Sequence, residues 1–545
     1  MPPPSGSPAT QTLGNAESPR SPGGRLRLLA AVASSALICL CSPAYPLWWL
    51  SFIAWIPLIW ACERVSARRA FGYGWLTGTL TILFGFAWVT DLLQTFGGLP
   101  TPFALLGHGL FAGYHGLMWA LPMGCAAAIG QRRPAALVWA LPLAWGAAEV
   151  LLPQVFEVHM SYFWSTKPEW IQTADVVGST GVGMLMLLLN VLIYRAAQSI
   201  VTEPSRAWKP IAVPVLIGVA IPSYGALRMR QVETAMENRP HVDIGVVQGN
   251  FGIKTRRAHR AQALSSLQRM SAELEAQGAQ MLVWGETSYP YSRFRRDTKR
   301  DFPHKRRYRV RRGFEAPLIL GVVTRKRKGR PFDVWNTALV LESDGTVGDL
   351  YDKNYPLWFG EHAPFVDPAW YLATFPNASH ITRGEEPGAL RVGDYTFGPL
   401  ICYEDLLPTF TRETAALGVN ALLAMNNESW FGRTNAQIDH LGLSTLRAVE
   451  HRLPLVRAVN AGPSAYITPA GVTKHRTPVT DSDRDGLQPP DGFVASVPMM
   501  DGTKRTLYGR FGGQFRFLVC VALAVALGLT LGSKRRQLGR YAPRH

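Results

Sequence analysis

The sequence has 545 residues, of which 47% are hydrophobic and only 17% are charged, and its formal net charge is +18. Globular proteins contain about 25% charged residues, so part of this chain is expected to lie outside water. The positive charge is local, because residues 293–312 contain eleven basic and two acidic side chains and residues 325–330 contain five more basic ones. This distribution does not predict a nucleic-acid-binding surface along the whole chain.

Long apolar stretches predict a membrane protein. A helix that crosses a bilayer needs about 20 mostly apolar residues, and eight stretches are candidates: 28–43, 46–62, 71–92, 102–129, 134–152, 176–195, 210–228 and 515–533. Seven of them precede a long polar insert and one follows it. The predicted organisation is a disordered tail (1–24), a membrane domain (25–229), a polar domain (230–512), an eighth transmembrane helix (513–534) and a second tail (535–545).

The loops between these stretches predict an orientation. Lys and Arg concentrate in alternate loops, namely at Arg25 and Arg27, at Arg68 and Arg69, at Arg132 and Arg133, at Arg206 and Lys209, and after the last stretch. Basic residues favour the cytoplasmic side of a membrane, whereas large domains translocate largely regardless of their charge. Both termini are therefore predicted to be cytoplasmic, and the polar domain is predicted to face the opposite side.

The polar domain alternates between two hydrophobic periods. Strand-like patterns occupy 241–248, 281–286, 318–323, 337–342, 395–403 and 421–425, and helical spacing occupies 257–277 and 437–451. Alternating strands and helices predict a layered α/β fold. Catalytic side chains are then expected where strands end, because a rigid sheet holds them and the loops admit substrate.

Cysteine usage isolates one thiol. Five of the six cysteines lie in apolar stretches, where cysteine usually behaves as a small hydrophobic residue, and only Cys402 lies in the polar domain. No spacing of Cys and His predicts a disulfide framework or a metal site. A cysteine in an apolar strand is most often a core residue. However, Glu286 at a strand end and Lys353 would supply the base and the cation that thiol catalysis requires.

The segments around these three residues resemble a known superfamily. WGETSYP (284–290), KNYPLWFGEHAPF (353–365) and ICYED (401–405) resemble the Glu–Lys–Cys motifs of the nitrilase superfamily. NNESWFG (426–432), the segment 437–462, TFGGLP (95–100) and TLYGRFG (506–512) extend the match. Together they resemble the bacterial apolipoprotein N-acyltransferases, which are membrane-integrated enzymes, from about residue 25 to residue 536.

The resemblance implies a fold and a reaction. The fold would be an αββα sandwich seated on eight transmembrane helices. Glu286 would be the general base that activates Cys402, and Lys353 would stabilise the oxyanion. The thiolate would take the sn-1 acyl chain of a phospholipid as a thioester. The α-amine of a diacylglyceryl-modified N-terminal cysteine of an apolipoprotein would then receive it. This ping-pong chemistry needs neither a metal nor another cofactor.

Further residues match the family less decisively. Glu361 corresponds to a second carboxylate near the triad and would support it, with a structural salt bridge as the alternative. Tyr403 and Glu404 follow the nucleophile and would either position its backbone or contact substrate. Trp430 and Phe431 are candidates for an acyl-chain pocket, although aromatic residues there could equally belong to a core. Gly285 departs from the family, which usually has Pro before the base.

The predicted protein is a monomer in the inner membrane of a bacterium, with several membrane-spanning helices, the α/β domain facing the periplasm and no nucleic-acid partner. Two alternatives remain open. One is a membrane-anchored nitrilase-type amidase, which would use water in place of the amine. The other is a nitrilase-like receptor or scaffold without catalytic activity. The basic stretch 293–330 allows three interpretations: a solvated mobile loop, attraction to anionic phospholipid head groups, or nucleic-acid binding.

Overall fold

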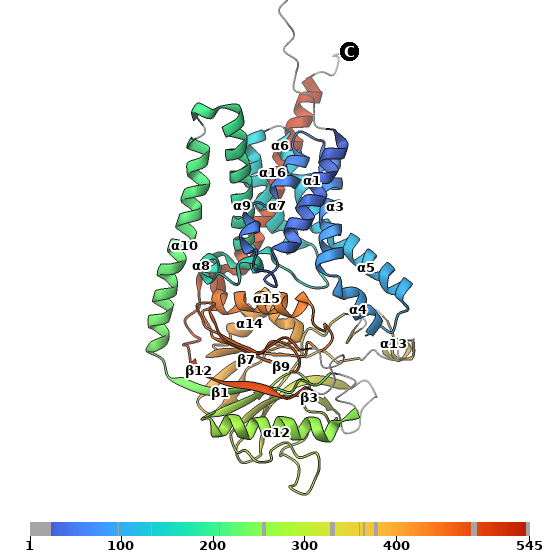
Figure 1. Cartoon of the computed structure of the whole chain (residues 1–545), viewed down its shortest axis with the longest axis vertical. Coiled ribbons are helices and arrows are strands. Elements are labelled where there is room, and N and C mark those ends of the chain that lie inside the picture. The colour runs from blue at the N-terminus through green and yellow to red at the C-terminus, as the bar shows by residue number, and fades with distance from the viewer. Residues whose placement is uncertain are drawn as a thin grey trace, which may run out of the picture.

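The computed structural model of the chain describes two parts stacked along its long axis, a bundle of helices and an α/β sandwich (Figure 1). Residues described are 23–95, 97–131, 133–206, 208–252, 258–326, 333–358, 360–362, 366–374, 380–480 and 488–540. Most of the predicted tail 1–24 and the end of the predicted tail 535–545 lie outside these residues. The last helix, α16, continues to Arg540.

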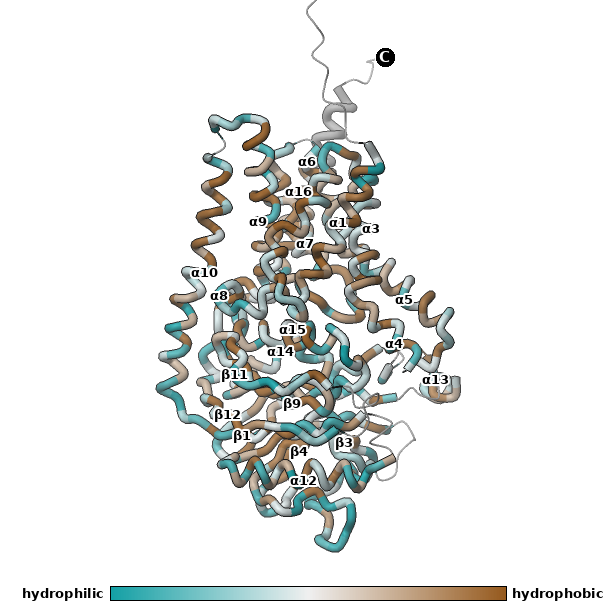
Figure 2. Tube along the Cα trace, in the orientation of Figure 1, coloured by the Kyte–Doolittle hydropathy of each residue, from teal (hydrophilic) through white to brown (hydrophobic). Residues whose placement is uncertain are grey.

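The helical part contains most of the apolar residues, which form the brown segments in Figure 2. Its helices are α1 (Gly24–Leu40), α2 (Ile56–Cys62), α3 (Ala67–Gly85), α4 (Trp88–Thr95), α5 (Thr101–His115), α6 (Leu117–Gly130), α7 (Leu137–Leu151), α8 (Pro168–Ile171), α9 (Ala174–Thr202), α10 (Trp208–Glu237) and α16 (Leu507–Arg540). Two single-turn 3-10 helices, Trp48–Phe52 and Met160–Trp164, lie where this part meets the sandwich.

The prediction of eight transmembrane helices is wrong. Among the described residues, four helices are long and apolar enough to cross a membrane, and a fifth qualifies if α3 and α4, which meet at 60°, form one bent span. The four are Pro134–Leu151, Ala174–Thr202, Trp208–Glu237 and Leu507–Thr530. Of the other stretches, 28–43 forms the 17-residue helix α1, and the remaining ones form helices that are bent or interrupted.

The interruptions have visible causes. The stretch 46–62 divides into the 3-10 helix Trp48–Phe52 and the seven-residue α2. The stretch 102–129 breaks at Gly116 between α5 and α6, and α5 leans away from the bundle in Figure 1. A Cβ at Gly116 would lie 2.5 Å from Oγ1 of Thr79 in α3, so the break lies where two helices approach closely. A window of hydropathy records composition and does not detect such breaks.

The α/β part contains two six-stranded sheets. The first has the order β12 (Asp491–Pro498), β1 (His241–Gln248), β2 (Met281–Trp284), β3 (Leu318–Arg325), β4 (Val334–Leu341) and β5 (Val347–Asp352). The second has the order β11 (Thr473–Arg476), β10 (Ala465–Ile467), β9 (Leu455–Val459), β8 (Ala421–Asn426), β7 (Tyr395–Ile401) and β6 (Leu390–Val392). The central strands β2 (Met-Leu-Val-Trp) and β8 (Ala-Leu-Leu-Ala-Met-Asn) are buried on both faces, which is why their residues are almost all apolar and do not alternate with polar ones.

Helices cover both outer faces of the paired sheets. On the first sheet, α12 (Arg260–Ala276) packs Leu264, Leu267 and Leu274 against a core that includes Trp284. On the second sheet lie α14 (Pro408–Ala415) and α15 (Asn435–His451), while the short α13 (Pro368–Thr374) lies at the periphery. The predicted four-layer αββα arrangement is therefore confirmed.

One helix joins the two parts, because α15 lies between the second sheet and the helical bundle (Figure 1). At its C-terminal end, the buried guanidinium of Arg452 donates to Oδ2 of Asp175 in α9 at 2.9 Å and to the Gln172 carbonyl at 3.0 Å. An ion pair that also satisfies backbone carbonyls fixes the geometry of a buried contact. The sandwich is therefore held against the bundle at a defined angle.

The basic stretch lies at the opposite end of the sandwich. Gln268 of α12 donates to the carbonyls of Arg309 and Val310 at 2.9 and 3.0 Å, so residues near 300–312 pack beyond the α12 layer. They form the hydrophilic loop at the end of the molecule farthest from the bundle (Figure 2). This position of residues 300–312 does not favour the interpretation that they contact the head groups of a membrane around the helices.

Candidate active site

The ends of three strands, two in the first sheet and one in the second, bring the predicted catalytic side chains together. Glu286 follows β2 by two residues, Lys353 directly follows β5, and Cys402 directly follows β7. Nζ of Lys353 lies 3.1 Å from Oε1 of Glu286 and 2.7 Å from Oε2 of Glu361. The Lys353 and Glu286 side chains are only 1% and 5% exposed. A buried cation therefore lies between two carboxylates, which offsets the cost of its burial.

The carboxylate of Glu286 is oriented from two sides. Besides Lys353, Nδ2 of Asn336 in β4 donates to the same oxygen, Oε1, at 2.7 Å. The residue before it, Gly285, lies so close to the second sheet that a Cβ there would come 2.7 Å from the backbone nitrogen of Asn460. The glycine that departs from the family pattern thus occupies a point where the sheets touch. The next residue, Thr287, has a φ of +47°, which a β-branched side chain rarely adopts.

Cys402 begins a sharp turn, the 3-10 helix Cys402–Leu406, with a φ of +56°. Residues held in this region are strained and persist where the surroundings fix them. Glu404 does so by accepting hydrogen bonds from the backbone nitrogens of Ile401 at 2.7 Å, Asn354 at 2.5 Å and Tyr355 at 3.1 Å. One buried carboxylate therefore connects the turn that begins at Cys402 to the loop that contains Lys353. Burial raises the pKa of Glu404 to about 7, against the effect of these donors.

Burial sets the protonation of the three central groups. Burial, and then the Glu286 carboxylate, raises the pKa of the Cys402 thiol well above its ordinary value. Burial also raises the pKa of Glu286, although Lys353 opposes that shift. Burial alone would lower the pKa of Lys353, but Cys402, Glu286 and Glu361 together raise it well above its usual value. The resting site thus favours a neutral thiol and a charged ammonium, and the raised pKa of Glu286 makes its carboxylate form a stronger base.

The thiol borders an apolar cavity that both parts of the molecule build. The empty space there, which is partly open to solvent, amounts to about 610 Å³. The helical part contributes Phe86, Trp88, Phe156, Val158 and Tyr162, and the sandwich contributes Leu357, Cys402, Tyr403, Leu406, Phe431, Ala436, Asp439, His440 and Leu443. Trp88 packs edge-on against Phe431 at 4.9 Å between ring centroids. An apolar pocket with few polar groups at one wall suits a hydrocarbon chain whose reactive end meets the thiol.

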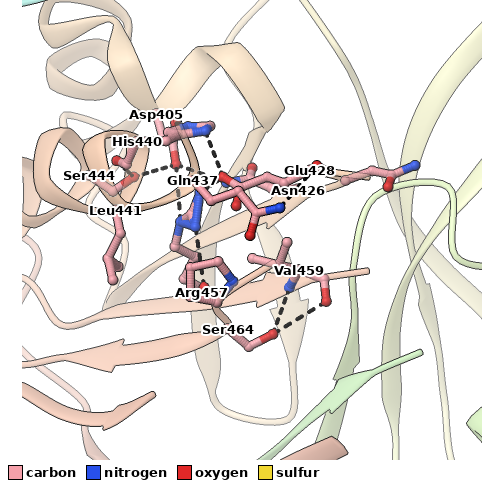
Figure 3. Close-up of polar contacts among 12 residues, drawn as sticks. Asp405, Asn426, Glu428, Gln437, His440, Leu441, Ser444, Arg457, Val459 and Ser464 are labelled. Atoms are coloured by element: carbon pink, nitrogen blue, oxygen red, sulfur yellow. Dashed lines mark hydrogen bonds and ion pairs between the residues drawn. The ribbon is translucent and has the colours of Figure 1, made fainter. Parts of the chain in front are cut away.

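A buried polar cluster lies behind this wall (Figure 3). Nε2 of His440 in α15 lies 2.6 Å from Oδ1 of Asp405, and its Nδ1 lies 2.8 Å from Oε1 of Glu428. Arg457 of β9 pairs with the same carboxylate of Glu428, and Ser444 donates to Oδ2 of Asp405 at 2.7 Å. Two carboxylates therefore face two cations in a setting with little solvent. Although burial opposes it, Asp405 above all raises the pKa of His440 to about 9.

Of the other predicted site residues, four lie at the site and one is not among the residues found there. Glu361 and Glu404 contact the catalytic loops as described, and Tyr403 and Phe431 line the cavity. Trp430, predicted beside Phe431, is not among the described lining residues. Sequence reasoning missed Asn336, for which a strand asparagine gave no signal. It also missed Asp405, Glu428 and His440, although each lies inside a segment that resembles the family.

Comparisons with known proteins agree with this two-part arrangement. Residues 34–192 match the family model described as apolipoprotein N-acyltransferase N-terminal domain, and residues 243–480 match carbon-nitrogen hydrolase. An apolipoprotein N-acyltransferase of Geobacter metallireducens is 26% identical, with 93% of this chain and 95% of the relative covered. One from Shewanella oneidensis is also 26% identical, with 94% and 96% covered. Among solved structures, an amidase from the nitrilase superfamily of Nesterenkonia AN1 matches at 20% identity and a TM-score of 0.37, over 52% of this chain and 98% of that chain.

Proposed function

We propose that this chain, which is similar over most of its length to apolipoprotein N-acyltransferases, is an enzyme of that kind and moves an acyl chain from a phospholipid to the N-terminal amine of a diacylglyceryl-modified lipoprotein through a thioester on Cys402. The observation that supports this proposal best is the position of Cys402. The thiol borders a cavity whose apolar walls come from both the membrane helices and the sandwich. A hydrolase of soluble amides would not need such a wall.

In the first half-reaction Glu286 takes the proton of the Cys402 thiol, and the sulfur attacks the carbonyl carbon of the sn-1 ester. Negative charge then develops on the carbonyl oxygen, where the Lys353 ammonium and the backbone N–H after Cys402 stabilise it. The bond between that carbon and the glycerol oxygen breaks. The proton held by Glu286 passes to the leaving oxygen, so a lysophospholipid departs and a thioester remains.

In the second half-reaction a neutral α-amine attacks the thioester. Glu286 removes a proton from the nitrogen, the bond between carbon and sulfur breaks, and the proton returns to the sulfur. The products are an N-acylated lipoprotein and the free thiol. Lys353 remains charged throughout, because the surrounding anions raise its pKa. Phe431 would hold the acyl chain in both steps, and Tyr403 would contact it close to the sulfur.

The inner membrane, with the sandwich in the periplasm, is the proposed location. The basic loops support this orientation because they gather at one end of the bundle. Nη1 of Arg27 donates to the Ala61 and Glu63 carbonyls, and Nη2 of Arg195 donates to the Pro134 carbonyl. That end lies opposite the sandwich in Figure 1. Positive residues there would face the cytoplasm, which would leave the sandwich outside and both chain ends inside.

The proposal is tested by trapping the intermediate. Purified protein is incubated with a phospholipid labelled in its sn-1 chain, and peptides are analysed by mass spectrometry before and after hydroxylamine. A hydroxylamine-sensitive acyl adduct on Cys402 is expected, and Cys402→Ala should lack it. Adding a diacylglyceryl peptide should remove the adduct and acylate the peptide amine. Release of free fatty acid with no peptide acylation would instead identify a hydrolase, and absence of any adduct would overturn both half-reactions.

A further inference from the structure

A second concave site lies on the side of α15 that faces away from Cys402. It encloses about 1000 Å³ of space that is partly open to solvent. Its walls are the loop from Ser165 to Pro168 below the bundle, Ile438, Leu441, Gly442 and Thr445 of α15, and the edge strand β11. We refer to this site as the α15 groove.

The groove and the catalytic cavity are separate. The cavity is lined from α15 by Ala436, Asp439, His440 and Leu443, whereas the groove is lined by the residues between them. With 3.6 residues per turn, these two sets lie on opposite faces of the helix. A ligand in the groove is therefore separated from Cys402 by the full width of a helix, about 10 Å.

The third wall of the groove is basic. β11 has the sequence Thr-Lys-His-Arg, and all four residues are exposed. His475 stacks on Phe493 of the first sheet at 5.1 Å, so it points between the sheets. Successive strand residues point to opposite faces, which directs Arg476 to the α15 side. Lys474 is the extra residue of a β-bulge between β11 and β10, and it also lines the groove. Within the described part of the chain, neither cation has a recorded ion pair, and the groove lining contains no Asp or Glu.

A buried hydroxyl on another wall has no partner. Ser165 lines the groove, is only 7% exposed, and its Oγ makes no hydrogen bond within the described structure. A buried polar atom without a partner carries a free-energy cost. Gly442 leaves space beside it, since a Cβ there would lie 2.7 Å from that Oγ. Among the described residues, Ser165 and the two cations line the same groove, the hydroxyl without a hydrogen bond and the cations without an ion pair, and an anion oxygen would complete this arrangement.

Aromatic side chains next to the groove place it at the end of the bundle. Trp48 and Trp170 are half-buried beside the groove loop, with 6.1 Å between their ring centroids, and Trp164 lies behind them in the core. Lys167 in the same loop places its ammonium 5.4 Å from the Trp48 ring. Tryptophan with neighbouring lysine is typical of the level where a membrane meets water.

From these observations we propose that the α15 groove binds the head-group phosphate of an anionic phospholipid that is not the acyl donor. Lys474 and Arg476 pair with the phosphate, Ser165 donates to it, and the acyl chains extend past the aromatic rim along the bundle. Phospholipid is favoured over a peptide because, within the part of the chain that the structure describes, two cations without an ion pair lie close to half-buried tryptophans at the end of the bundle. The inference does not depend on the catalytic proposal, since the site involves no residue of the cavity.

Binding is measured by native mass spectrometry of the delipidated full chain in detergent, titrated with phosphatidylglycerol. The double variant Lys474→Glu/Arg476→Glu should bind at least about tenfold more weakly, because each basic residue near an anionic surface contributes about a factor of five. The matched control Lys305→Glu/Arg307→Glu makes the same charge change in the loop beyond α12 and should bind like the wild type. Acyl transfer from a phosphatidylethanolamine donor in detergent should be unchanged in both variants, which verifies that they fold.

Four results would overturn the proposal. Equal affinity of the wild type and the groove variant for phosphatidylglycerol would show that the groove does not bind the lipid. An equal loss of affinity in the control variant would show that the effect depends only on the net charge of the protein. Displacement of phosphatidylglycerol by millimolar inorganic phosphate would identify a site for free anions. If the groove variant bound phosphatidylglycerol normally but no longer bound a lipoprotein-derived peptide, the groove would be a site for the lipoprotein and not for the lipid.

Discussion

Asp405 and His440 form a contact of 2.6 Å that joins the nucleophile turn to α15. Asp405 lies three residues after Cys402, and its other oxygen accepts from Ser444, one helical turn after His440. Because α15 also packs against the bundle, the position of the turn that contains Cys402 depends on the position of the helices. The imidazole bonds to a carboxylate through each of its nitrogens, so it is charged in the folded protein.

Replacing His440 should remove a pH dependence of stability. Its folded pKa, about 9, exceeds the ordinary value of 6.5, so its stabilising effect is complete below pH 6.5 and is lost as pH rises through 9. The melting temperature of the wild type in detergent should therefore fall between pH 6.5 and 9.5 by more than that of His440→Gln. His451→Gln is the control, because burial lowers the pKa of that histidine to about 3 and it stays neutral over this range. Parallel curves for wild type and His440→Gln would contradict the prediction.

Lys353→Met should abolish acyl transfer and also destabilise the protein. Removing the ammonium leaves the carboxylates of Glu286 and Glu361 buried without their common partner, which costs about 3–5 kcal/mol when one member of a buried pair is lost. Thermal unfolding and the hydroxylamine-sensitive adduct are measured together. Adding Glu361→Gln should restore part of the stability without restoring the adduct, since the oxyanion still lacks its cation. Recovery of activity in the double variant would exclude Lys353 from the chemistry.

Filling the cavity should change acyl-chain preference. Ala436 lines the cavity and is 7% exposed, so Ala436→Phe places a ring where a chain would lie. Transfer from a donor with a 16-carbon sn-1 chain should fall about tenfold relative to a donor with an 8-carbon chain, which corresponds to about 1.4 kcal/mol of discrimination. Competition between the two donors measures the ratio. Ala416→Phe, the same change at an exposed position of the sandwich, should leave the ratio at its wild-type value.

Gly285→Ala should displace the general base. The added Cβ would meet the backbone of Asn460 at 2.7 Å, and overpacking of this kind costs about 1–3 kcal/mol. A lower melting temperature and slower adduct formation are expected together. Gly109→Ala adds the same group on α5, where no atom lies within 4 Å, and should not reduce either quantity. An unchanged melting temperature of Gly285→Ala would contradict the prediction, because it would show that the two sheets can move apart at this point without destabilising the protein.

Much of the sandwich followed from the pattern of the sequence. β1 begins and ends where the alternation of His241–Gln248 predicts, and α12 and α15 lie within a few residues of the helical spacing. The strands that were missed, such as β6 and β11, are three or four residues long, too short for a period to register. β9 and β12 were also missed. The strand predicted to reach Tyr403 ends at Ile401, because Cys402 takes a positive φ that no sequence period encodes.

The catalytic residues could be proposed from motifs, but not the surfaces that surround them. Glu286, Lys353 and Cys402 each follow a strand, and order along the chain was enough to select them. The walls formed by Phe156 and Trp88 depend on how the bundle meets the sandwich, which involves contacts between residues more than 200 positions apart. Sequence patterns extend over a few residues, so they cannot predict such long-range contacts. The count of membrane helices failed for a related reason, since packing between helices produced the breaks.

Because the cavity is enclosed jointly by the bundle and the sandwich, neither part is an independent module. A chimera that exchanged the sandwich alone would pair one homologue's Phe431 and Leu443 with another's Trp88 and Phe156, and the two halves of the wall would no longer interlock. Recombination within such proteins is therefore constrained to crossovers that keep the loop 153–162, the nucleophile turn and α15 together. The range of substrates would then depend on the residues at this contact between the bundle and the sandwich.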